Sequence, residues 1–188
     1  MLISIKGVKK IMAKSSKRKL QRDEQKVLKV LENNANESIG NIAKRCGFSR
    51  QKVWRIIKQL EENNTIWGYH ACVDAEKINR KRFILLFKLK HLPINNEIEK
   101  NILDGRIDEV AEKYNIKVED NIWIHGIYDG IISFYAEDLR EAKQFHELLN
   151  NIYEGNIIDS QLLEEIITIK KDGFVNPRME KSDSLLKV

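Results

Sequence analysis

The feature that most constrains this chain is residues 38–63, which have the pattern of a helix, a glycine turn and a second helix. Ser38 and Ser49 each precede a helical pattern, where a serine hydroxyl can accept a hydrogen bond from a free first-turn N–H. Gly47 lies between the two patterns, at a chain reversal whose positive φ favours glycine. The segment therefore predicts a helix-turn-helix.

The second predicted helix, about residues 49–62, has two chemically different faces. Apolar residues recur at 3-4-7 spacing and predict a buried stripe of Val53, Ile56, Ile57 and Leu60. Between Ser49 and Leu60 there are four basic residues and no acid. A short helix with an apolar back and a cationic front suits DNA recognition. A structural corner with a solvated basic face is the alternative that this segment leaves open.

Seven residues of this helix are predicted to bind DNA. They are Ser49, Arg50, Gln51, Lys52, Trp54, Arg55 and Lys58. Arginine and glutamine can read base edges in the major groove, so we expect Arg50, Gln51 and Arg55 to specify sequence. The lysines and the backbone N–H groups at Ser49 would contact phosphates. Trp54 has two open interpretations, contact with DNA or packing against the preceding helix.

Flanking segments complete a small domain. Residues 23–33 are amphipathic and predict a first helix, so that three helices share one core. Residues 65–74 are rich in β-forming side chains and predict a strand that ends in a turn. We therefore predict a winged-helix-like DNA-binding domain over 21–68, followed by a strand and linker over 69–80.

Residues 22–78 resemble the amino-terminal half of the Lrp/AsnC family, the leucine-responsive and asparagine-responsive transcription regulators, without a gap. The matching motifs are Ile42-Ala43, Gly47-Phe48-Ser49, Val-x-Arg-x-Ile-Lys-x-Leu-Glu from Val53, and Ile-x-Gly-Tyr-x-Ala-x-Val-Asp from Ile66. The resemblance implies a sequence-specific DNA-binding regulator of transcription.

A change of apolar period at about residue 81 indicates a second domain. The patterns predict strands over 82–90, 116–125, 132–135 and 157–170, and helices over 95–114 and 139–152. Asp138 and Glu141 form a cap and N3 acid pair at the start of the second helix. The order βαββαβ predicts a ferredoxin-like α+β domain over 81–171, with a tail over 172–188.

The resemblance also implies functions for this domain. In the family such a domain joins protomers into dimers, often into octamers, and binds small amino-acid-like effectors. The turn Gly126–Asp129 resembles the family's Gly-x-x-Asp turn beside the effector pocket, so Gly126, Tyr128 and Asp129 are the candidate effector-binding residues. His125 replaces a small hydroxyl residue and would change the pocket's volume and polarity. A plain hairpin is the other interpretation, because Asp129 and Gly130 tolerate positive φ.

The formal charge of +5 is unevenly distributed. Residues 1–22 carry eight Lys/Arg and no acid, whereas residues 81–188 carry fifteen bases and twenty acids. We therefore expect DNA to approach the amino-terminal side. Residues 1–20 are predicted to be a disordered basic extension that adds phosphate contacts, with both Met1 and Met12 open as the start.

Other function classes have less support in the sequence. Cys46 and Cys72 lack metal-ligand spacing and are predicted to be small core residues, so no metal or other cofactor is expected. We find no phosphate-binding glycine loop and no nucleophile with a base, and predict that the chain is not an enzyme. A siroheme-decarboxylase-like enzyme and an effector-independent architectural DNA-binding protein remain the alternatives. No membrane span or secretory segment is predicted, so we expect a cytoplasmic location.

Overall fold

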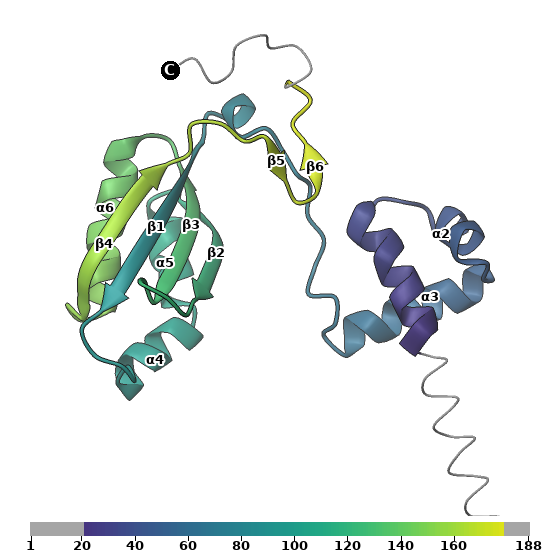
Figure 1. The fold of residues 1–188 in the computed structure, drawn as a ribbon, viewed down its shortest axis with the longest axis horizontal. Helices are drawn as coiled ribbons and strands as arrows, with labels where there is room; N and C mark the ends of the chain where they lie inside the picture. The colour runs from purple at the N-terminus through teal and green to yellow at the C-terminus, as the bar shows by residue number, and fades with distance from the viewer. Residues whose placement is uncertain (1–20, 179–188) are drawn as a thin grey trace, which may run out of the picture. The chain divides into compact units, whose positions relative to one another are not determined.

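The computed structural model describes residues 21–178, which divide between Ala71 and Cys72 into two compact units (Figure 1). The predicted basic extension, 1–20, lies outside the described residues, as do residues 179–188 of the predicted tail.

Three helices make up the first unit. Residues 21–33 are helical, and α2 (Ile39–Cys46) and α3 (Arg50–Glu62) follow. Apolar side chains from all three helices close one core, in which Val27 and Val53 are fully buried. Helices this short are marginal alone, so the shared apolar core supplies most of their stability.

The predicted serine caps and glycine turn are confirmed. The Oγ atom of Ser38 accepts a hydrogen bond from the Asn41 N–H at 3.2 Å, and that of Ser49 accepts one from the Lys52 N–H at 3.2 Å. Gly47 ends α2 with a φ of +71°. The caps fix where each helix begins, and therefore which side chains α3 turns toward the core.

The strand predicted over residues 65–74 is not formed. Residues 67–74 have no regular secondary structure, and the first strand in the described chain is β1 (Lys81–Leu89). A strand needs a neighbouring strand to bond its N–H and C=O groups, which β-forming side chains alone do not provide. Trp67 is consequently 94% exposed. A short 3-10 helix, η1 (Ala75–Ile78), leads into β1.

The second unit has the predicted ferredoxin-like α+β fold (Figure 1). Its four strands are antiparallel in the order β2-β3-β1-β4. In chain order, the elements after β1 are α4 (Asn96–Leu103), α5 (Arg106–Lys113), β2 (Lys117–Trp123), β3 (Gly130–Ala136), α6 (Leu139–Ile152) and β4 (Ile157–Glu164). The predicted cap of α6 is confirmed, because Oδ1 of Asp138 accepts a hydrogen bond from the Glu141 N–H at 2.9 Å.

The core of this unit lies between the sheet and its helices. Alternate residues of β1 point to the same face, and Phe83, Leu85 and Phe87 are fully buried there. Phe134 of β3 and Phe145 of α6 pack edge to face, with ring centroids 4.8 Å apart. Side chains of α4 and α5 join the same cluster, so all three helices cover one face.

Two predicted elements are shorter than expected. The helix predicted over 95–114 is interrupted at Gly105, whose left-handed φ of +75° breaks the helical path between α4 and α5. β4 ends at Glu164, which pairs with Phe83 near the start of β1, so little of β1 remains to pair further. Beyond it, β5 (Lys170–Lys171) and β6 (Phe174–Val175) form a separate hairpin, and of the two strands only β6 lies in the predicted tail, 172–188.

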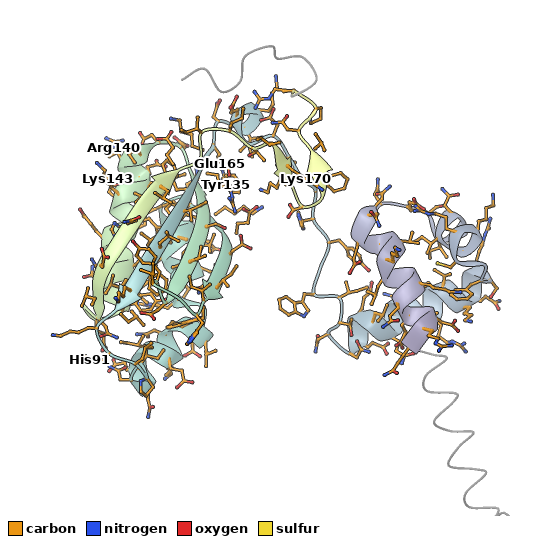
Figure 2. The ribbon with its side chains drawn as sticks, viewed as in Figure 1. His91, Tyr135, Arg140, Lys143, Glu165 and Lys170 are labelled. Carbon is orange, nitrogen blue, oxygen red and sulfur yellow. The ribbon has the colours of Figure 1, made fainter. Side chains whose placement is uncertain are left out.

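A charged cluster at one end of the sheet holds this hairpin in place. Glu119 is ion-paired with Arg82 at 2.7 Å and with Lys171 of β5 at 2.5 Å. Lys171 also lies 4.7 Å from the centroid of the Tyr135 ring, and Arg82 reaches Glu165 at 3.1 Å. Tyr135 and Glu165 are labelled at this end of the sheet in Figure 2. Burial raises the pKa of Glu119, but the hydrogen bonds from Lys171 and Arg82 outweigh it, so the pKa is lowered overall.

Candidate nucleic-acid interface

The outward face of α3 carries a row of polar and cationic side chains. Gln51, Arg55 and Lys58 lie three to four residues apart and are therefore neighbours along the helix. Arg50 and Trp54 flank this row, and all five residues are exposed. Trp54 is 54% exposed, which is more than packing against the preceding helix would leave. Its indole ring is therefore accessible to a ligand of this face.

The amino-terminal half of α3 borders a hollow in the surface. The hollow is lined by Ile39, Ser49, Arg50, Gln51, Lys52, Trp54 and Arg55. Ile39 is the first residue of α2 and is 37% exposed, so the starts of both helices border the hollow. The structure brings together six of the seven sequence-predicted DNA-binding residues, and Lys58 lies farther along α3.

Gly40 is a residue of this surface that the sequence analysis missed. A Cβ atom at Gly40 would lie 3.3 Å from both Nε and Nη2 of Arg50. The glycine therefore leaves room for the Arg50 guanidinium against the first turn of α2. No local pattern could have indicated this role, because it depends on how two separate helices pack.

Lys52 is directed toward the protein. Its Nζ atom is 2.7 Å from Oδ2 of Asp23 and 3.9 Å from the centroid of the Phe48 ring. The ion pair and the cation–π contact tie the first turn of α3 to the first helix and to the preceding turn. The Asp23 carboxylate offsets the charge of Lys52, so Lys52 offers less attraction to a DNA phosphate than an unpaired lysine would.

Lys58 is also ion-paired within the unit. Its Nζ atom lies 2.7 Å from Oε2 of Glu61, and Oε1 of Glu61 accepts a hydrogen bond from the Tyr69 hydroxyl at 3.2 Å. The hydrogen bond with Glu61 raises the pKa of Lys58, and the same bond lowers the pKa of Glu61. Burial and then the Glu61 bond raise the pKa of Tyr69. At neutral pH, the carboxylate therefore joins an ammonium group and a neutral phenol.

The candidate effector turn is bonded to β1. Oδ2 of Asp129 accepts a hydrogen bond from the Leu89 N–H at 2.8 Å, and the Asp129 N–H donates to the Phe87 carbonyl at 2.9 Å. Asp129 therefore supports the sheet from the turn. Gly126 and Tyr128 lie in the same turn, exposed and half-buried respectively.

The turn joins the antiparallel strands β2 and β3, as the hairpin interpretation expects, but it does so without positive φ. Residues 126–130 all lie outside that backbone region. Gly130 is required for space instead, because a Cβ atom there would be 2.1 Å from Cζ of Phe87. The constraint comes from a ring on the neighbouring strand, which the local sequence does not reveal.

The two cysteines differ in environment. Cys46 is buried in the helical core as predicted, and burial raises the pKa of its thiol. The prediction that Cys72 is a core residue is wrong, because Cys72 is exposed in the segment where no strand forms. Within residues 21–178, no cluster of three or more His, Cys, Asp or Glu side chains is arranged to hold a metal ion. No helix in that range has the length and apolar character needed to cross a membrane.

Comparisons with known proteins agree with this geometry. Residues 24–66 match the family described as winged helix-turn-helix DNA-binding. The chain is 25% identical over 158 residues to the HTH-type transcriptional regulator Ptr1 of Methanocaldococcus jannaschii, and the match covers 84% of this chain and 99% of that protein.

Two solved structures share the fold over most of the chain. The AsnC family transcriptional regulator from Agrobacterium tumefaciens superposes with a TM-score of 0.59 at 21% identity, covering 85% of this chain and 97% of that one. The transcriptional regulator NMB0573 of Neisseria meningitidis, solved as a complex with L-Met, gives a TM-score of 0.62 at 17% identity, covering 85% and 97%. The helix-turn-helix match and the similarity to Ptr1 identify the chain as a DNA-binding transcription regulator, and the solved structures show that it shares the fold of an AsnC family regulator.

Proposed function

We propose that α3 enters the DNA major groove and that Arg50, Gln51 and Arg55 read base edges there. The observation that carries this proposal is the exposed face of α3, on which these three residues lie around one hollow. Arginine binds guanine through two hydrogen bonds, and glutamine can do the same with adenine. The Ser49 end of α3 supplies N–H groups for a phosphate, and Trp54 supplies an apolar surface beside them.

Substitution of Arg55 tests this proposal directly. Arg55→Ala should weaken binding to a mapped operator duplex by about 1–3 kcal/mol, the usual scale for a base-reading arginine, and should weaken binding to unrelated DNA less. Lys29→Ala removes an exposed cation from the first helix and serves as the matched control. Operator binding by Arg55→Ala that equals the parent's would refute the assignment. Equal affinity of the parent for all sequences would favour the architectural alternative.

We propose further that the second unit pairs two copies of the chain through its sheet. In the described chain, no helix covers the sheet face opposite α4–α6. The centre of this face is apolar and half-buried, and it includes Ile84, Leu86 and Ile131. Apolar area of this kind is usually buried against another protomer. A two-fold dimer would present two α3 helices and favour a roughly palindromic operator.

Sedimentation of the full chain tests the dimer. The parent should be a dimer at micromolar concentration, and Leu86→Glu should shift it to monomer, because a carboxylate would be buried without a partner. Leu103→Glu places the same charge at a residue that is 77% exposed on α4, and should leave the dimer unchanged. A monomeric parent would remove the basis for palindromic recognition.

An amino-acid-like effector at the Gly126–Asp129 turn completes the proposal. The support is the L-Met complex of the structurally similar Neisseria protein, together with a carboxylate at Asp129 that could pair with an ammonium group. Since Asp129 also accepts the Leu89 N–H, removal of the whole side chain would disturb β1. Asp129→Asn keeps an acceptor oxygen and removes only the charge.

Calorimetry with the twenty amino acids on the parent and on Asp129→Asn tests the effector. We expect one or more amino acids to bind the parent and to bind Asp129→Asn more weakly. Binding that survives unchanged would place the effector elsewhere. The absence of binding to the parent would indicate regulation without an amino-acid effector.

A further inference from the structure

The carboxyl-terminal end of α3 carries two acids whose charge is unfavourable beside the helix dipole. Glu61 and Glu62 are its last two residues, and its last turn contains no basic residue. The carbonyl end of a helix has a partial negative charge, so acids there are unfavourable for helix stability and bases are favourable. These two acids therefore contribute nothing to the stability of α3 through its dipole.

Glu61 instead holds a cation of the DNA-facing row. Lys58 lies three residues after Arg55 and seven after Gln51, and therefore on the same side of α3. Its ammonium group is 2.7 Å from Glu61, whose second oxygen bonds Tyr69 at 3.2 Å. The carboxylate is thus held from both sides, by Lys58 and by Tyr69, and it carries the negative charge nearest to the Lys58 ammonium group.

We propose that Glu61 limits the DNA affinity of this protein by competing with phosphate for Lys58. The inference rests on the proposed binding of DNA by α3 and deepens it. Glu61 takes one of the three N–H donors of Lys58 and offsets its charge, so the net contribution of Lys58 to DNA affinity is smaller than that of an unpaired lysine. The Tyr69 hydroxyl keeps Glu61 in place and lowers the chance that the carboxylate swings away to solvent.

The experiment measures the affinity of Glu61→Gln for the operator duplex and for an unrelated duplex over a range of KCl concentrations. Release of one surface ion pair should tighten binding to both duplexes by about two- to five-fold at moderate salt. One additional phosphate contact should steepen the plot of log K against log salt by about 0.9. The gain should be similar for both duplexes, because phosphate contacts carry no sequence information.

Two further variants separate competition for Lys58 from general repulsion of DNA. Glu62→Gln removes the same charge from the next residue, which is exposed, and should give a smaller gain without a change of slope. In a Lys58→Ala background, Glu61→Gln should give no gain, because the cation that it would release is absent. An unchanged Glu61→Gln affinity, an equal gain from Glu62→Gln, or a gain that persists without Lys58 would each overturn the inference.

Arg55→Ala distinguishes a failure of this inference from a failure of the proposed interface. If Arg55→Ala weakens binding while Glu61→Gln has no effect, only the role of Glu61 is wrong. If Arg55→Ala binds like the parent, the proposed interface is wrong, and the inference about Glu61 is overturned with it.

Discussion

Replacement of Gly130 by alanine should strongly destabilise the second unit. Gly130 is the first residue of β3 and pairs directly with Phe87 of β1. An alanine Cβ would lie 2.1 Å from Cζ and 2.5 Å from Cε1 of the Phe87 ring. Carbon atoms attract one another at separations of about 3.5–4.0 Å, so this overlap must be relieved by movement of the ring or of a strand.

The surroundings of Phe87 determine how much that movement costs. The ring is fully buried, and its centroid lies 5.1 Å from the Tyr153 ring and 6.0 Å from the Trp123 ring. Overpacking of a filled core typically costs about 1–3 kcal/mol. We expect the upper end, about 3 kcal/mol, because the overlap involves several ring atoms. With a urea dependence of about 2 kcal/mol/M, the unfolding midpoint should fall by about 1.5 M.

Fluorescence of Trp123 provides the assay, because its ring contacts Phe87. Trp54→Phe and Trp67→Phe, both exposed positions in the first unit, would make Trp123 the reporter in a common background. Gly126→Ala is the matched control, since a Cβ there would meet nothing within 4 Å. Phe87→Leu should partly restore the stability of Gly130→Ala by making room for the methyl group. A Gly130→Ala midpoint equal to that of the parent would show that the core is not filled around Phe87.

Three further predictions follow from individual groups. Deletion of residues 1–20 removes seven Lys/Arg, so affinity for unrelated DNA should fall and become less salt-sensitive, as measured by titration at several salt concentrations. The buried Tyr153 hydroxyl has no hydrogen-bond partner among the described residues, so Tyr153→Phe should leave the urea midpoint equal or higher, and a clear decrease would contradict this. The His146 ring forms a hydrogen bond with the Ser160 hydroxyl at 2.8 Å. Burial lowers the pKa of His146 below its usual value of 6.5, so protonation of this ring opposes folding. The free energy of unfolding should therefore be highest above pH 6.5 and decrease as the pH falls below it, and His146→Gln should reduce this dependence in urea titrations at several pH values.

Features that depend only on residues close together in the sequence were predictable from the sequence alone. Ser38, Ser49 and Asp138 each cap a helix through a bond to the residue three positions later. Gly47 adopts the left-handed conformation expected at the end of α2. The apolar periods of α3 and β1 identify the buried faces of both elements. Such features follow from the geometry of a single helix or strand, so a short stretch of sequence is sufficient to predict them.

Only the tertiary structure decided which polar groups are paired with residues far away in the sequence. The pair of Lys58 with Glu61 has i,i+3 spacing and is local to α3, whereas Lys52 is held by Asp23, which lies 29 residues earlier in the first helix. Gly130 resembles a turn residue but is required by the Phe87 ring of another strand. Whether Lys52 is available to DNA, or a methyl group fits at Gly130, depends on atoms that packing brings from distant parts of the chain. Local pattern contains no information about those distances, because they are set when the core closes.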